Sequence, residues 1–379
     1  MSGETVLIAA FSGRSLAQSA RRAGYRPFVA DAFGDIDTKE AADDIRVIDG
    51  AMQTGFHTKQ IVAALEDLSR ASGSAPIGLV LGSGFEDKPR LVGALAARFR
   101  LLCSGAETIA TCKDPKKFFG MLGKLGVRHP ETQIERPSSP EDWISKRVGG
   151  SGGRHIRDCS GPSHSKPRRY FQQRLSGDRY SVGGLIDIPT SDGGRSDSYF
   201  ATKQWTSPSL KHPYRFGGCV SQPVCDPNLL RDLVNIASRV GDELSLKGMA
   251  SFDFIVSDGV PYLLEVNPRP GASADVLDDP TGNFFRAQMA AWANGEYWPG
   301  ERTAPKAMAI LHADRGPVIL GNTPWPEWSA DRGASGTVVP EGAPLASVFA
   351  EAATADAAEA LARSRLAELE DLIYGHAKS

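Results

Sequence analysis

Three potential oxygen ligands stand close together in the second half of the chain. Asp253 lies in an apolar run, and Glu265 and Asn267 follow it 12 and 14 residues later. The intervening Ser-Asp-Gly at 257–259 is typical of a hairpin turn, so the three side chains would meet on adjacent strands. Carboxylate and amide oxygens suit Mg²⁺, which proteins usually share with nucleotide phosphates. The hairpin therefore indicates a magnesium- and ATP-dependent site, although Asp253 could instead cap the turn or pair with a lysine.

A glycine-rich segment could wrap a phosphate group. Lys146 lies on a predicted strand that leads into Gly149-Gly150-Ser151-Gly152-Gly153-Arg154. Four glycines in five positions leave the backbone free to turn its N–H groups toward an anion. The segment lacks the Gly-Lys-Ser/Thr of a Walker A loop, and a merely flexible loop is the alternative. Lys113, 33 residues before Lys146, stands where a helix is predicted to begin, and for it a charged surface helix is the alternative.

The first hundred residues predict a parallel sheet covered by helices. Apolar strands at 6–11, 27–30 and 77–81 alternate with helical patterns. The turns that follow two of these strands, 12–15 and 82–87, would lie at the carboxyl edge, where open α/β sheets bind ligands. Neither turn is a G-x-G-x-x-G with an acidic residue at the right distance, so a dinucleotide site is not expected. Glycines needed only for turning are the alternative.

Composition excludes several classes of partner. The chain has 379 residues, of which 41% are hydrophobic and 23% charged, with a formal net charge of −2 and a pI of about 6.4. This balance favours a globular protein of two or three lobes, with neither a nucleic acid nor a membrane as partner. The apolar start at 5–11 is too short for a membrane span and is expected to be a strand. Five cysteines without a C-x-x-C pair are typical of reduced thiols, so a cytoplasmic location is expected.

The order of these pieces resembles the ATP-grasp superfamily, in which two α+β subdomains clamp ATP between them. Lys113, Lys146 and the glycine-rich loop are followed by a Gln-Gln hinge with Gly177-Asp178, and then by the predicted hairpin. The most specific piece is Glu265-Val266-Asn267-Pro268-Arg269. Beyond residue 300, Ala313-Asp314-Arg315 and the segments 336–339 and 342–345 look similar to the closing domain of the biotin carboxylase branch.

This resemblance implies a fold of mixed α/β and α+β class. It implies a Rossmann-like pre-ATP-grasp domain over residues 1–105 and an ATP-grasp domain of two subdomains over residues 106–300. A small C-terminal α+β domain would follow over residues 301–379. The glycine-rich loop at 149–153 would belong to the middle domain.

The resemblance also implies how a nucleotide would be held. Lys113 and Lys146 would neutralise α- and β-phosphate oxygens, because a lysine is a compact charge. The loop with Gly150-Ser151-Gly152 would close over the phosphates. Gln173-Arg174-Leu175 would hold adenine, largely through backbone groups, although many relatives carry a glutamate where Gln173 stands. Asp178 would accept hydrogen bonds from ribose hydroxyls.

The acidic hairpin would be the metal site of such an enzyme. Asp253, Glu265 and Asn267 would hold one or two Mg²⁺ ions, and Mn²⁺ would also fit. Glu265 is the firmest of these assignments, because a carboxylate in so apolar a strand is costly without a partner. Arg269 would stabilise a phosphoryl group or an acyl-phosphate in the catalytic step, together with Lys146. A simple ion pair with an acidic neighbour is the alternative for Arg269.

Members of this superfamily mostly activate a carboxylate as an acyl-phosphate, which a nucleophile then attacks. Such chemistry needs no Ser-His or Cys-His nucleophile, and this sequence has no recognisable one. The leading hypothesis is an ATP- and Mg²⁺-dependent ligase that joins a small carboxylate to an amine. One possibility within it is an enzyme of cofactor biosynthesis, of the tyramine–glutamate ligase kind. One alternative is a bicarbonate-using carboxylase acting on a separate partner. The other is a non-catalytic, ATP-binding regulatory module.

Two segments are candidates for contact with the small-molecule substrates. The loop at 82–86 is one of them. The other is the stretch 203–216, which mixes aromatic and cationic side chains and would suit a carboxylated small molecule. A surface loop packed on itself explains the second stretch equally well. A homodimer is compatible with the resemblance.

Overall fold

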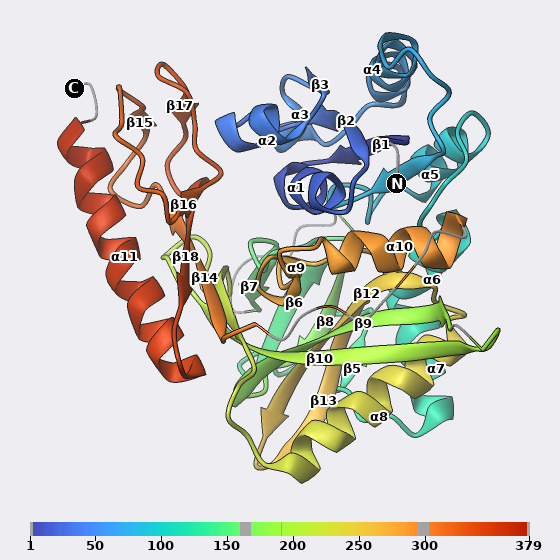
Figure 1. Ribbon diagram of the computed structural model, residues 1–379. Coiled ribbons are helices and arrows are strands. Elements are labelled where there is room, and N and C mark those ends of the chain that lie inside the picture. The colour runs from blue at the N-terminus through green and yellow to red at the C-terminus, as the bar shows by residue number, and fades with distance from the viewer. Residues whose placement is uncertain are drawn as a thin grey trace.

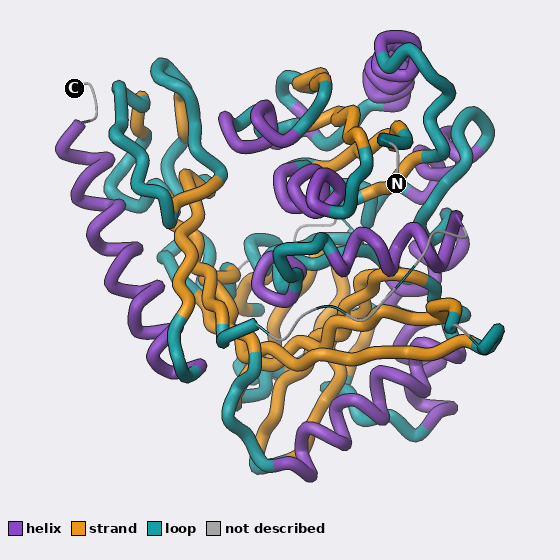
Figure 2. Tube along the Cα trace, viewed as in Figure 1, coloured by secondary structure: helices purple, strands orange, loops and turns teal. Residues whose placement is uncertain are grey.

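The fold is built from β-sheets with helices packed against them, as Figures 1 and 2 show. A computed structural model describes residues 3–159, 168–190, 192–293, 297, 300 and 303–376, and within them the strands form four β-sheets. The predicted fold class is confirmed, since a helix-covered parallel sheet is followed by antiparallel sheets packed with helices. In this described part of the chain, no helix is both long and apolar enough to cross a membrane.

The N-terminal lobe is a four-stranded parallel sheet with the order β3-β2-β1-β4. Successive side chains of a strand point to opposite faces. Val6 and Ile8 therefore pack in one core with α1, whereas Leu7 and Ala9 pack in another with α4 and α5. Burial on both faces explains why this strand is apolar throughout. The elements are β1 (Thr5–Ala10), α1 (Arg14–Arg22), β2 (Arg26–Asp31), α2 (Ile36–Ala41), β3 (Asp44–Val47), α3 (Ala51–Thr54), α4 (Thr58–Ala71), β4 (Leu79–Leu81) and α5 (Pro89–Ala96).

A small antiparallel sheet with the order β5-β8-β6-β7 comes next. Its elements are α6 (Ala106–Lys113), α7 (Pro115–Leu125), β5 (Thr132–Gln133), β6 (Trp143–Arg147), β7 (Ile156–Asp158) and β8 (Arg169–Gln173). The predicted helix start at Lys113 is wrong, because Lys113 ends α6. Asp114 is extended, as expected for a residue before proline, and its carboxylate caps α7 by accepting from two backbone N–H groups.

The largest sheet has eight strands in the order β13-β12-β9-β10-β11-β14-β18-β16, with antiparallel pairings throughout. The predicted hairpin is confirmed as β12 and β13, joined at Asp258-Gly259. Helix α10 lies between this sheet and α1 of the N-terminal lobe, and α8 packs against β9, β10 and β13 (Figure 1). The elements are β9 (Asp178–Pro189), β10 (Arg195–Thr206), β11 (Phe216–Ser221), α8 (Pro227–Glu243), β12 (Gly248–Ser257), β13 (Val260–Asn267), α9 (Ala274–Leu277) and α10 (Asn283–Ala293).

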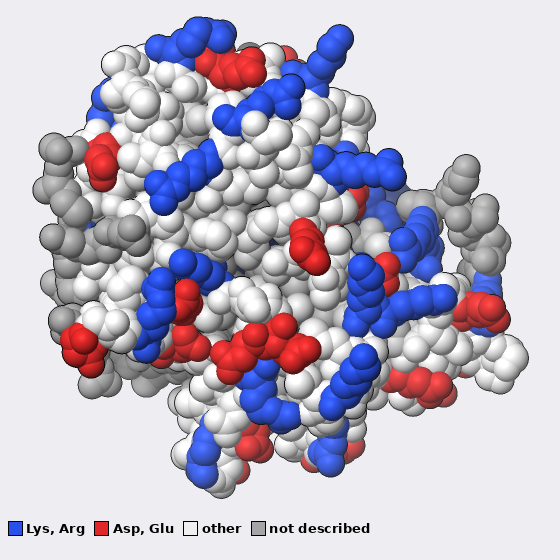
Figure 3. Space-filling view, turned by 90° about the vertical axis from the view of Figure 1, so that its right-hand side faces the viewer, with Lys and Arg blue, Asp and Glu red and all other residues white. Residues whose placement is uncertain are grey.

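The C-terminal residues extend this same sheet. Strand β14 pairs with β11 on one side and β18 on the other, so the pairing runs across the domain boundary predicted at residue 300, which stays a prediction. Helix α11 packs against β14 and β18 (Figure 1). On the face shown in Figure 3, Lys and Arg are interspersed with Asp and Glu. The elements are β14 (Lys306–His312), β15 (Val318–Ile319), β16 (Ser329–Ala330), β17 (Val338–Val339), β18 (Pro344–Glu351) and α11 (Ala355–His376).

Candidate active site

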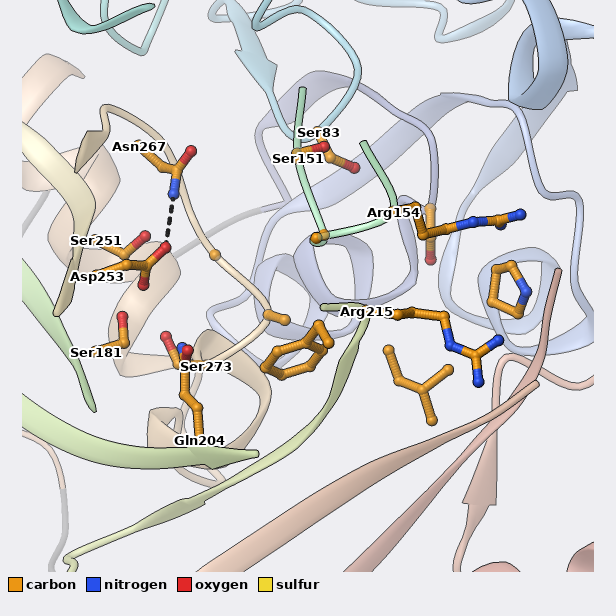
Figure 4. Close-up of a pocket in the computed structure, with 18 of the residues that line it drawn as sticks. Ser83, Ser151, Arg154, Ser181, Gln204, Arg215, Ser251, Asp253, Asn267 and Ser273 are labelled. Atoms are coloured by element: carbon orange, nitrogen blue, oxygen red, sulfur yellow. Dashed lines mark hydrogen bonds between the residues drawn. The ribbon is translucent and has the colours of Figure 1, made fainter. Parts of the chain in front are cut away.

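A cavity of about 450 Å³ lies between the small sheet, the large sheet and the N-terminal lobe. Its lining includes Lys146 of β6, the loop after β6, and inward-facing residues of the β12–β13 hairpin. The loop that follows β1 contributes from the N-terminal lobe, and β14 contributes from the C-terminal region. Figure 4 shows part of this lining. Segments from the whole length of the chain therefore meet at one cavity.

Hairpin register brings the three predicted metal ligands together. Asp253 stands opposite Glu265, and Asn267 is two residues further along β13, on the same face. The Asn267 Nδ2 donates to Asp253 Oδ2 over 3.3 Å, the bond drawn in Figure 4, and to Glu265 Oε1 over 3.4 Å. All three residues line the cavity. The structure therefore places two carboxylates and one amide within reach of a common point.

The two carboxylates titrate very differently. Burial and the neighbouring Glu265 carboxylate raise the pKa of Asp253 to about 6. Burial would also raise the pKa of Glu265, but Lys113 and Lys146, together with His155, outweigh it and lower that pKa to about 2. Like charges held this close favour a shared cation. Among the described residues, no group of three or more His, Cys, Asp or Glu side chains is arranged so that it could hold a metal ion.

Both predicted lysines lie beside these carboxylates. Lys113 Nζ is 2.7 Å from Asn267 Oδ1 and 3.8 Å from Glu265 Oε2, and its side chain is only 7% exposed. Lys146 Nζ is 3.3 Å from Gln172 Oε1, and burial lowers its pKa although Glu265 opposes the shift. In this arrangement the positive charges of the two lysines balance the negative charge of the Glu265 carboxylate. A bound metal ion and phosphates would change that balance.

The glycine-rich loop contributes Ser151, Gly152 and Gly153 to the cavity wall. Gly150 turns away, and a Cβ there would lie 2.2 Å from the His155 ring. Gly153 has a φ of +73°, and a Cβ on it would lie 1.9 Å from the backbone oxygen of Tyr214. The loop is thus packed directly on the chain that enters β11, and only glycine fits at residue 153.

The predicted adenine and ribose residues lie outside the residues that line the cavity. Gln173 is exposed, and its neighbour Gln172 is the residue whose side chain points inward. The backbone N–H groups of Gln173 and Arg174 donate to protein carbonyls, and the Asp178 carboxylate pairs with Lys203 at 3.3 Å. The roles of Gln173, Arg174, Leu175 and Asp178 stay predictions.

Arg269 has an acidic partner from the N-terminal lobe. Its Nε donates to Glu86 Oε1 over 2.7 Å, and both side chains are largely buried. The ion-pair alternative is therefore present in the structure. The same residue also lines the cavity, so a phosphoryl contact stays a prediction.

The predicted substrate segments reach the cavity only in part. Gly82 and Ser83 line it, as do residues 204–206 and 214–216, whereas the intervening loop makes hydrogen bonds with itself between Ser209 and His212. The turn at 12–15, which the sequence placed at the ligand-binding edge of the sheet, also reaches the cavity. Its Arg14 guanidinium pairs with Asp275 and Asp331 at 2.7 Å each.

Sequence reasoning assigned no role to three basic residues that line the cavity, which are Arg154, His155 and Arg179. No local motif marks these residues. Only the glycine-rich context of Arg154 and His155 gave a signal that could have found them.

Part of the chain matches a known family of domains. Residues 112–273 match the family model described as an ATP-grasp domain. The chain is 21% identical over 251 residues to the carbamoyl phosphate synthase large chain of Myxococcus xanthus. That match covers 57% of this chain and 22% of the synthase chain. A 49-residue stretch is 43% identical to D-alanine–D-alanine ligase of Limosilactobacillus fermentum, which is 13% of each chain.

Solved structures extend the likeness to the whole fold. The biotin carboxylase domain of 2-oxoglutarate carboxylase from Hydrogenobacter thermophilus, a dimer in complex with MgADP and bicarbonate, has a TM-score of 0.72 at 12% identity. The likeness covers 96% of this chain and 89% of that one. The chain spans less than a quarter of the carbamoyl phosphate synthases that it matches. It carries an ATP-grasp domain over residues 112–273, and its overall fold is similar to that of a biotin carboxylase domain.

Proposed function

We propose that the protein is an ATP- and Mg²⁺-dependent ligase that activates a small carboxylate as an acyl-phosphate and joins it to an amine. One observation carries the proposal: Lys146, the glycine-rich loop and the Asp253–Glu265–Asn267 cluster all line the same cavity. Cationic groups, backbone donors and oxygen ligands are what phosphoryl transfer requires, because its catalysis is mainly positioning and charge neutralisation. The D-alanine–D-alanine ligase likeness supports amide formation in particular.

The donor set fits a hard divalent cation. The side chains of Asp253, Glu265 and Asn267 offer two carboxylates and an amide oxygen, which are the ligands that such a cation prefers. A bound Mg²⁺ would supply charge neutralisation for the β- and γ-phosphates of ATP. Mn²⁺ has similar ligand preferences and would fit the same residues.

The chain's own residues would perform the remaining steps. Lys146 and Lys113 would stabilise phosphate oxygens by charge, since both are already held beside Glu265. Backbone N–H groups of Ser151 and Gly152 would cover the phosphates and exclude water. Arg269 would approach the acyl-phosphate from the side of the N-terminal lobe, where the Glu86 carboxylate orients its guanidinium. The amine then attacks the acyl carbon and phosphate leaves with the bonding electrons.

A second candidate shares the first half of this chemistry. The fold of a biotin carboxylase domain covers nearly the whole chain, which favours bicarbonate as the acid and a carboxylated partner or small molecule as the product. That relative is described as a dimer, which supports a homodimer here as a proposal. The tyramine–glutamate ligase kind of substrate stays a prediction within the first candidate.

The test is ATP turnover against a panel of carboxylic acids and amines, with bicarbonate as a separate arm. Carboxylate- and amine-dependent release of ADP is the expected result, and bicarbonate-dependent release would favour the second candidate. Glu265→Gln should lower turnover by at least 100-fold, as one of the few metal-binding side chains is lost. The matched control, Glu243→Gln, changes an exposed residue of α8 and should leave turnover unchanged. ATP binding without turnover in any arm would contradict both candidates and favour a regulatory module.

A further inference from the structure

The cavity has a cationic end away from its carboxylate cluster. Figure 4 shows Arg154 and Arg215 side by side, on the far side of the cavity from Asp253 and Asn267. Arg154 follows the glycine-rich loop, is about half-buried and lines the cavity. Its backbone oxygen is fixed by His212 Nδ1 at 3.1 Å. Its guanidinium has no hydrogen bond or ion pair with any residue that the structure describes.

Arg215 has the opposite character. It is 1% exposed, and its guanidinium makes a two-pronged pair with the Asp314 carboxylate at 2.9 and 2.7 Å. Its remaining donors reach Ser207 and the carbonyl of Gly342. Every donor of Arg215 is therefore used within the protein, and its charge is balanced. It holds the chain beneath Arg154 in place but is not available to a ligand.

His312 supplies an independent observation at the same end. It lies on β14, lines the cavity and is only 5% exposed. Its Nδ1 is buried and has no hydrogen-bond partner among the described residues. Because Nδ1 is enclosed by protein, a ligand in the cavity would meet the other part of the ring, where a neutral imidazole can donate a hydrogen bond from Nε2.

An anion in the cavity suits both residues, because both line it and both can donate hydrogen bonds. A carboxylate or phosphate accepts two parallel hydrogen bonds from an arginine fork, and it would accept a third from the imidazole N–H. The acid to be activated has to place one carboxylate near the Asp253–Glu265–Asn267 cluster, where the phosphoryl group would be transferred. A group bound by Arg154 at the other end must then be a second one.

We infer that Arg154 and His312 form an anion subsite that selects a substrate with a second acidic group, a carboxylate or a phosphate. This inference rests on the proposed ligase function and names the substrate class of the same site. Arg215 and Asp314 act as positioning residues for it. Acids that carry one carboxylate and an uncharged tail would bind without this contact.

The experiment compares matched acids by calorimetric binding to the full chain with MgADP present. One arm pairs monocarboxylates with dicarboxylates of equal length, such as butyrate with succinate, from two to six carbons. The other arm pairs hydroxy acids with their phosphate esters, such as glycerate with 3-phosphoglycerate. In at least one pair the doubly anionic acid should bind about 10- to 100-fold tighter, the range for a charge-assisted hydrogen bond. The arm that shows the effect identifies the acidic group.

Two substitutions complete the test. Arg154→Gln should abolish the advantage of the second acidic group, whereas the control Arg147→Gln, an exposed arginine on the preceding strand, should keep it. His312→Leu should weaken the binding of the doubly anionic acid by roughly 3- to 10-fold, and unchanged binding would show that His312 is not part of the subsite.

No preference in any pair, or a preference that survives Arg154→Gln, overturns the inference even if acids do stimulate ADP release. Arg154-dependent binding without any turnover would instead overturn the proposed function and leave the subsite in place.

Discussion

Glu86→Gln offers the sharpest test of how the lobes are held together at the cavity. Glu86 belongs to the loop after β4, and its Oε1 lies 2.7 Å from Arg269 Nε, which follows β13. The two side chains are 6% and 14% exposed. Burial would raise the pKa of Glu86, but Arg269 and Lys113 outweigh it, so the carboxylate is ionised. Glutamine keeps the shape of the side chain and removes the charge.

The expected loss of stability is large, because the change leaves a buried guanidinium without its counter-charge. Removing one partner of a buried ion pair costs about 3–5 kcal/mol. Glu66→Gln is a matched control, since Glu66 pairs with Arg98 at 3.9 Å and both side chains are about half exposed. An exposed pair of that kind contributes less than about 1 kcal/mol.

The assay is urea unfolding followed by tryptophan fluorescence and circular dichroism. Glu86→Gln should lower the free energy of unfolding by about 3–5 kcal/mol, and the control should change it by less than about 1 kcal/mol. The double variant Glu86→Gln with Arg269→Met should recover part of the loss, because the unpaired charge is then gone. If Glu86→Gln unfolds at the same urea concentration as Glu66→Gln, the reasoning about the buried pair is refuted.

Three further predictions test the phosphate-binding elements and the buried histidine. Lys146→Met should weaken MgATP binding by about 10- to 100-fold in calorimetry. The control Lys117→Met changes an exposed lysine, and the same MgATP affinity in both variants would contradict the prediction. Gly153→Ala should lower ATP turnover more than tenfold, because its Cβ would collide with a backbone oxygen 1.9 Å away. The control Gly120→Ala, at an exposed position of α7 with open space and no positive φ, should retain most activity. Burial and neighbouring arginines lower the pKa of His312 to about 3, so the unfolded chain binds this proton first, and the contribution of His312 to stability should fall by about 1.5–2 kcal/mol from pH 6.5 to pH 5. His312→Gln should flatten that decline in urea titrations, and an unchanged slope would show that another group causes it.

Local patterns were enough to predict much of this molecule. The hairpin at 248–267 follows from a Ser-Asp-Gly turn between two apolar runs, and alternation along each strand places Asp253, Glu265 and Asn267 on one face. The helix-covered parallel sheet follows from apolar strands alternating with helical patterns. The helix break at Lys113 was missed, although Asp114-Pro115 carries the signal for it.

Contacts between distant segments were beyond the reach of the sequence. Lys113 meets Asn267 across 154 residues, and Glu86 meets Arg269 across 183. Neither pair has a periodicity or a spacing that could reveal it. Arg154 looked like the end of a flexible loop, and its isolation at the cavity wall depends on how that loop packs on the chain entering β11.

The chain by itself therefore indicated which residues would bind phosphate and metal, an assignment that stays a prediction, because turns, strands and glycine freedom are set by neighbours in sequence. Only the tertiary structure decided which charges are neutralised and which are left for a ligand. Arg215 and Arg154 are both arginines near the cavity, yet one is satisfied by Asp314 and the other is free among the described residues. That difference arises from the packing of separate lobes, where the burial of apolar surface fixes distances that no local pattern encodes.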